Sequence, residues 1–247
     1  MHYLFDGSFD GLMTVVFDTY RLSPRIQTLS VYTGADSLLP TQYISRDPDK
    51  AARIKRYLVK HMGPHFLKMV QTAFLSRREG RFAAIVRTLQ RAIEQGPSVL
   101  SLVDKDARLF YVCHREVERE AHRFTGLLRM RVMRDGTLLA VFEPVHDILT
   151  LLLPHFLDRY PDERLLLYDE GRKLAGMAAG GQVTFMQVDY LEPDDLEGEQ
   201  YMQRLWRTFY DALAIPGRIN PKLRQQHMPK YTWGNLPEMR GIQPPSR

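Results

Sequence analysis

The sequence predicts an α+β protein, in which an antiparallel sheet with packed helices is joined to a basic helical subdomain. Residues 46–125 carry apolar side chains at helical spacing, broken by glycine-proline pairs. Residues 126–188 instead alternate apolar and polar side chains, with glycine-containing turns between the runs. The third observation is charge, because residues 50–134 hold 19 Lys or Arg against 7 Asp or Glu.

Length and composition allow this architecture. The chain has 247 residues and 44% hydrophobic side chains, which is enough apolar mass for one large core or two smaller ones. We predict four regions within one integrated domain. They are a small strand-helix-strand unit (1–45), a basic helical region (46–125), an antiparallel α+β region with a C-terminal helix and packed tail (126–236), and a loose tail (237–247).

The first hundred residues contain several residue types that are typical of the beginnings and ends of helices. Residues 2–6 and Ile26–Tyr32 have the pattern of strands, and Ser8 is placed to cap a helix between them. Asp47-Pro48 is a helix start, because proline at the first helical position has no N–H to leave unpaired. Gly63-Pro64 ends that helix and opens the next, and a third helix is expected to follow.

The centre of the chain is a basic helix that leads into a basic strand. The helix that includes Val112 is expected to end at Gly126, in the manner of a glycine C-terminal cap. The next strand alternates apolar side chains with Arg129, Arg131 and Arg134. Two interpretations remain open: these cations form an ordinary solvated face, or they bind an anion.

The sheet is expected to continue beyond this strand. Asp135-Gly136 between two alternating runs is a strong hairpin signal, which joins the basic strand to Thr137–Glu143. A leucine-rich helix over Ile148–Tyr160 precedes three more strands between residues 164 and 188. Hairpin connections predict an antiparallel sheet with a helix on one face.

The last sixty residues are predicted to contain one helix and a packed tail. The acidic stretch Asp194–Glu199 is expected to form the first turn of this helix, and the helix is expected to bury its apolar side chains. These are Met202, Leu205, Trp206, Phe209, Tyr210 and Leu213. Residues 215–236 show no periodicity, yet they retain large rings of the kind that disordered segments lack. We therefore expect them to pack on the domain as irregular structure.

Several classes of protein are excluded by the sequence. A single cysteine, Cys113, excludes an intramolecular disulfide and any multi-cysteine zinc or iron–sulfur site. We find no signal-peptide pattern and no apolar stretch long enough to span a bilayer, so a cytoplasmic protein without a membrane partner is expected. No nucleotide-binding, zinc-protease or deaminase motif occurs, and no cofactor is predicted.

The uneven charge suggests a polyanionic partner. Residues 50–134 carry an excess of twelve positive charges, which would attract nucleic acid. However, residues 135–200 hold 4 Lys or Arg against 14 Asp or Glu. The alternative is therefore internal neutralisation, in which the basic block docks on the acidic one.

Four side chains are candidates for catalysis or metal binding. They are His122, His146, Asp147 and His155. Imidazole and carboxylate groups would suit acid/base chemistry or metal ligation if the fold brings them together. No helical-turn spacing joins the histidines, so a structural interpretation stays open. In that interpretation Asp147 caps a helix and His155 belongs to a polar stripe with Arg159.

Aromatic and basic residues alternate near the C-terminus, as nucleic-acid binding to phosphates and exposed bases requires. The alternative is that Tyr231 and Trp233 merely anchor the tail. The complete set of candidate nucleic-acid-binding residues is Arg115, Arg119, Arg123, Arg129, Arg131, Arg134, Arg218, Asn220, Lys222, Lys230, Tyr231 and Trp233.

Short motifs along nearly the whole chain resemble a bacterial family of probable DNA metabolism proteins. The matching words are Y-L-F-D-G-S-F-D-G-L near the start, E-x-x-x-H-R-F-x-G-L-L-R from Glu118, E-P-x-H-D-I-L from Glu143, P-H-F-x-x-R from Pro154, Y-D-E-G-R-K from Tyr168, L-W-R-T-F-Y-x-x-x-x-I-P-x-R-x-N-P-K-L from Leu205, and M-P-x-Y from Met228.

The resemblance implies a context more than a chemistry. Members of that family look like partners of a radical-SAM DNA repair or modification protein, and a similar domain is joined to a uracil-DNA glycosylase-like domain in some proteins. Radical-SAM chemistry would belong to the partner, because this chain lacks the cysteines for the cluster. We therefore expect a DNA-binding accessory protein. The alternatives are a nuclease or glycosylase-like enzyme using the His/Asp candidates, and a protein-interaction module that does not bind DNA.

Overall fold

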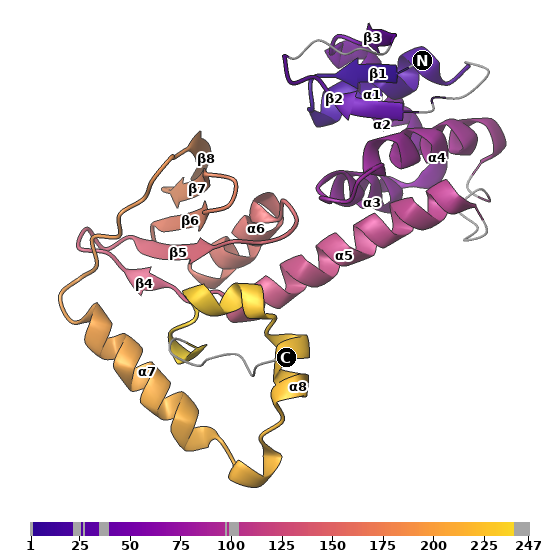
Figure 1. The fold of residues 1–247 in the computed structure, drawn as a ribbon. Coiled ribbons are helices and arrows are strands. Elements are labelled where there is room, and N and C mark those ends of the chain that lie inside the picture. Colours follow the sequence, from indigo (N-terminus) through magenta and orange to yellow (C-terminus); the bar gives the residue numbers. More distant parts are fainter. Residues whose placement is uncertain are drawn as a thin grey trace. The chain divides into compact units, whose positions relative to one another are not determined.

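The computed structural model describes residues 2–21, 26, 28–34, 40–96, 98 and 104–239. The chain divides into two compact units, Met1–Glu118 and Arg119–Arg247, which we call unit 1 and unit 2 and describe separately (Figure 1). Their boundary falls within the long helix α5 (Lys105–Leu127). Most of the predicted loose tail, residues 240–247, lies outside the described residues.

Unit 1 contains a three-stranded parallel sheet in the order β2-β1-β3. Its strands are β1 (His2–Phe5), β2 (Thr28–Val31) and β3 (Thr41–Tyr43). Parallel neighbours need a crossover connection, and α1 (Phe9–Thr19) lies in the connection from β1 to β2. The predicted strand-helix-strand opening is therefore present, with one further strand.

Helices make up the rest of unit 1. They are α2 (Pro48–Met62), α3 (Pro64–Phe74), α4 (Arg81–Gln95) and the first part of α5. Two predicted caps are confirmed: the Ser8 hydroxyl accepts a first-turn N–H of α1 at 2.9 Å, and Asp47 accepts two in α2 at 3.0 and 3.1 Å. These bonds satisfy donors that would otherwise have no partner at a helix start.

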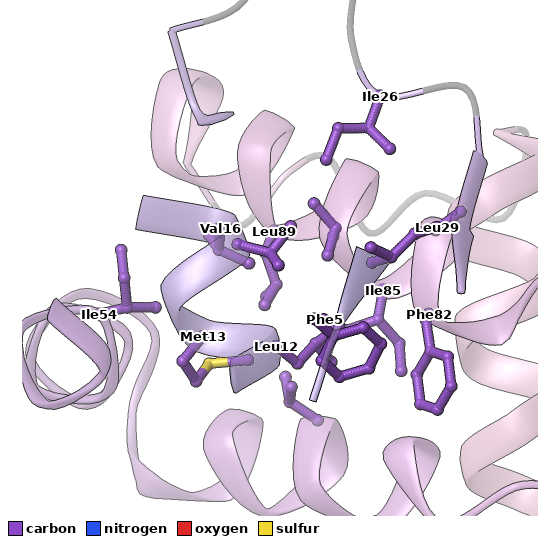
Figure 2. Packing of buried hydrophobic residues seen from close by; sticks show 14 of the residues in the cluster. Phe5, Leu12, Met13, Val16, Ile26, Leu29, Ile54, Phe82, Ile85 and Leu89 are labelled. Atoms are coloured by element: carbon purple, nitrogen blue, oxygen red, sulfur yellow. The ribbon is translucent and has the colours of Figure 1, made fainter. Parts of the chain in front are cut away.

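The core of unit 1 forms between β1, α1 and α4. Phe5, Leu12, Val16, Ile85 and Leu89 are among its fully buried side chains (Figure 2). Burying one such side chain contributes about 1.5–3 kcal/mol, so this cluster is the main source of cohesion in the unit.

Unit 2 contains a five-stranded sheet in the order β4-β5-β6-β7-β8. The strands are β4 (Arg131–Val132), β5 (Leu138–Phe142), β6 (Leu165–Asp169), β7 (Leu174–Ala179) and β8 (Gln182–Gln187). The predicted class, helices packed with sheet structure, is confirmed. One pairing differs from the purely antiparallel prediction: β5 and β6 are parallel. The reason is the connection, because α6 (Leu149–Arg159) carries the chain between them as a crossover.

The tail packs on unit 2 only in its later part, because residues 217–223 are all exposed. Residues 237–239, which the sequence predicts to be loose, pack as well. The tail contains η2 (Pro216–Arg218), α8 (Pro221–His227), η3 (Lys230–Asn235) and η4 (Pro237–Met239). Trp233, Leu236 and Met239 are buried together with Leu127 at the end of α5. Irregular structure is therefore held here by a small apolar cluster of its own.

The prediction for the preceding helix, α7 (Glu199–Leu213), is wrong in one respect. The helix forms, but none of its residues is buried. Met202 is 59% exposed, Phe209 54% and Leu213 65%. Apolar periodicity shows that one face of a helix avoids water, but it does not show which molecule covers that face.

Two predicted helix ends also differ. Gly126 lies within α5, which continues to Leu127, and its backbone is not left-handed. Asp147 does not cap α6, because the residue at that position is Ile148. Although α5 has 23 residues, neither it nor any other helix in the described ranges is apolar enough to cross a membrane.

Candidate functional site

The three arginines that follow α5 are each paired with a carboxylate. The pairs are Arg129–Glu238 at 2.6 Å, Arg131–Asp195 at 3.6 Å and Arg134–Asp194 at 3.0 Å. Two of the carboxylates belong to the acidic stretch 135–200. For this part of the basic block, the geometry therefore favours internal neutralisation over the predicted phosphate-binding face.

Glu238 is the most enclosed of these partners, with no exposed surface. Arg129 donates from Nε and Nη2 to one of its oxygens at 3.1 and 2.6 Å. The indole Nε1 of Trp206 donates to the other oxygen at 3.1 Å, and the Arg129 guanidinium lies 5.2 Å from the Trp206 ring. The carboxylate thus ties η4 to α7 and to the segment after α5.

A second buried carboxylate, Glu120, organises a polar cluster in unit 2. It is 4% exposed and accepts the backbone N–H groups of Val145 and His146 at 2.9 and 2.7 Å. The Tyr231 hydroxyl donates to it at 2.7 Å. Glu120 therefore joins α5 to the loop before α6 and to η3. We use the name polar cluster for Glu120, His146, Asp147, Asp169, Arg172 and Tyr231.

Arg172 holds the same loop through its carbonyl groups. Its guanidinium donates to the carbonyl oxygens of Pro144 and Val145 at 3.1 and 2.6 Å. It also donates to Asp169 at 2.9 Å, and that carboxylate is fully buried. Backbone donors and acceptors of one short loop are thus satisfied by two charged side chains of opposite sign.

Burial shifts the proton affinity of this cluster. It raises the pKa of Asp147, and the positive charge of Arg172 opposes this shift. The Asp147 Oδ1 atom has no hydrogen-bond partner among the described residues. Burial also raises the pKa of Asp169, which Asp147 raises further. The pKa of Tyr231 is raised by burial and by its bond to Glu120, so the phenol stays protonated and donates.

Asp147→Asn is expected to stabilise the protein at about pH 7 and to leave its stability unchanged well below about pH 4. A carboxyl whose pKa is raised on folding binds more protons in the folded chain. The unfolding free energy therefore falls as the pH rises through the interval above the ordinary pKa. Urea denaturation of both proteins across this pH interval measures the difference. An equal gain at every pH would contradict the role of the buried charge.

The structure brings together only part of the predicted histidine and aspartate set. His146 and Asp147 lie in the polar cluster, whereas His122 and His155 are exposed, and no described contact links either of them to it. Within the described ranges no group of three His, Cys, Asp or Glu side chains could hold a metal ion. The loop that carries His146 and Asp147 is held by hydrogen bonds of Glu120 and Arg172 with its backbone, which favours a structural role for the cluster.

The C-terminal aromatic residues also serve packing. Trp233 is 7% exposed and donates from Nε1 to the carbonyl oxygen of Met228, so its ring is not open to a nucleobase. The Asn220 side chain caps α8 at 3.0 Å. Tyr231 is 41% exposed despite its bond to Glu120. The exposed cations of this region are Arg218, Lys222 and Lys230.

The remaining predicted cations lie along α5. Arg115, in unit 1, is exposed and donates to the Tyr111 hydroxyl at 3.3 Å. Arg119, in unit 2, is exposed. Arg123 is partly buried and hydrogen-bonds the Tyr231 hydroxyl, so it supports the polar cluster.

Unit 1 presents a row of cations that was not among the predicted binding residues. Arg53, Arg56 and Lys60 follow one another at spacings of three and four on α2, and all three are exposed. No carboxylate of the described chain lies within ion-pair distance of them, in contrast to Lys50 and Lys55, which pair with aspartates. The spacing is visible in the sequence and could have identified this row, which we call the α2 cation row.

Comparison with known proteins adds a family. A protein-family model described as a domain of unknown function, DUF4130, matches residues 79–238, which include all of α4 and α5 and nearly all of the described part of unit 2. Neither the curated proteins nor the solved structures contain a significant match.

Proposed function

Because the chain belongs to the DUF4130 family, whose function is unknown, we propose from its own surfaces that it is a DNA-binding accessory protein of a repair or modification system. The observation that carries the proposal is the α2 cation row. Three exposed cations without carboxylate partners on one helical face are suited to consecutive phosphates.

Two further points support the proposal. Unit 1 as a whole holds 17 Lys or Arg against 12 Asp or Glu, so its net charge adds to the positive potential around the row. The resemblance to probable DNA metabolism proteins supplies the repair or modification context. In that context, a radical-SAM or glycosylase-type partner would perform the chemistry.

Arg56→Ala combined with Lys60→Ala is expected to weaken DNA binding and to reduce the slope of log affinity against log salt by about 1.8 on duplex DNA. Each phosphate contact releases counterions from the DNA, so the loss of two contacts makes the affinity less dependent on salt. The measurement is fluorescence anisotropy with single-stranded and duplex oligonucleotides at several salt concentrations, using the full chain.

The charge-matched control is Arg204→Ala combined with Arg207→Ala, which removes two exposed cations from α7 instead. This variant should retain the slope of the parent protein. Absence of binding at low salt, or equal losses in both double variants, would mean that the α2 cation row does not bind DNA.

A further inference from the structure

The helix α7 carries an apolar face that no described residue of unit 2 buries. Its apolar side chains recur every three to four residues along one side of the helix. Trp206, at one edge of this side, contacts Glu238 and Arg129. The exposed members of the stripe are Tyr201, Met202, Leu205, Phe209 and Leu213, each at least 44% exposed.

The stripe continues into a groove of about 580 Å³ between the end of α7 and α8. Leu213, Ile215, Ile219 and Leu223 contribute aliphatic walls, and each is at least half exposed. Isolated apolar side chains on a surface are ordinary, but a contiguous stripe and groove of this kind mark an interaction site.

The charged lining of the groove is mainly cationic. Arg218 and Arg224 line it, against the single acid Asp211. The Arg224 guanidinium lies 5.7 Å from the Trp233 ring, and its buried Nε has no hydrogen-bond partner among the described residues. A carboxylate of a docking partner would meet the terminal nitrogens of this guanidinium, a group that pairs well with carboxylates.

We propose that this groove and stripe bind an acidic amphipathic helix of a partner protein. The apolar side of such a helix would cover the stripe, as in helix-in-groove recognition. Its carboxylates would pair with Arg218, Lys222 and Arg224 at the rim. The inference is independent of DNA binding, because it rests on other residues in the other unit.

Charge and shape favour this occupant over two others. A second copy of the chain would bring the same cationic surface face to face with itself, since six Lys or Arg and only Asp211 and the buried Glu238 lie between residues 201 and 239. Single-stranded nucleic acid needs planar rings on which its bases stack, whereas the groove walls are mainly aliphatic. Duplex DNA binds mainly through its phosphates and would leave the apolar side chains of the groove uncovered.

The test uses a fluorescent synthetic peptide and the full-length chain. The 15-residue α7 is about 22 Å long, so a peptide of about 18 residues, with leucine on one side and glutamate on the other, can cover it. Two comparison peptides are used. One has the same composition in scrambled order, and the other has lysine in place of glutamate. We expect the acidic amphipathic peptide to bind at least about ten times more tightly than either.

Phe209→Ala should weaken this binding about tenfold, because aromatic anchors dominate such interfaces. Val183→Ala truncates an apolar side chain on β8 that is 43% exposed and should have no effect. Four outcomes would each overturn the proposal: equal affinity for the three peptides, full affinity of the Phe209 variant, displacement of the peptide by an oligonucleotide, or a dimer that Phe209→Ala dissociates.

Discussion

Replacing Glu120 by alanine is expected to lower the unfolding free energy of unit 2 by about 3 kcal/mol, because three donors lose a charged acceptor that is itself buried. The donors are the N–H groups of Val145 and His146 and the Tyr231 hydroxyl. The His146 N–H is buried, so it reaches water as an alternative acceptor only if the loop before α6 opens. Both tryptophans of the chain lie in unit 2, so urea denaturation followed by tryptophan fluorescence reports on this unit.

Glu163→Ala is the control within unit 2. That side chain is exposed, so its loss should cost less than about 1 kcal/mol. Glu120→Gln keeps one acceptor oxygen and should fall between the two variants. If Glu120→Ala and Glu163→Ala unfold at the same urea concentration, the polar cluster does not hold unit 2 together.

Local chemistry explains why some elements could be predicted from the sequence. Ser8 and Asp47 cap helices with their own side chains, and Gly136 has the positive φ of 81° that a tight turn requires. In each case the interacting groups are at most three residues apart. Such signals do not depend on how the rest of the chain is arranged.

The polar cluster was harder to predict because its contacts are distant in sequence. Glu120 and Tyr231 are 111 residues apart, and a glutamate within a basic helix suggests a solvated side chain. One signal was available. Glu120 lies three residues after Val117 and four before Phe124, which places it on the buried side of α5. A carboxylate among apolar side chains indicates a buried hydrogen-bonding role.

The pairing of the arginines in residues 50–134 was hard to predict for the same reason, because several of their partners are distant in sequence. Composition alone does not distinguish Arg129, whose partner Glu238 is 109 residues away, from Arg56, which has no described carboxylate partner. Net charge describes the whole segment, while binding depends on the cations that remain unpaired. The structure therefore moves the candidate phosphate-binding surface from the strand after α5 to α2.

Arg129→Ala is expected to destabilise unit 2 by about 3 kcal/mol, because it leaves the charge of a fully buried carboxylate without its cation. Only the Trp206 indole would still donate to Glu238. Any loss of DNA binding in this variant would then follow from unfolding, so a binding assay needs a parallel denaturation curve.

Glu238→Gln separates the charge from the packing of Arg129 on the Trp206 ring. In that background position 238 carries no negative charge, and Arg129→Ala should cost only about 1 kcal/mol for the lost ring contact and the lost bond to the Gly126 carbonyl oxygen. The difference between the two costs, measured by urea denaturation of the four proteins, is the coupling energy of the pair. Equal costs in both backgrounds would show that Arg129 stabilises unit 2 through these two contacts, and that Glu238 tolerates burial without a cation.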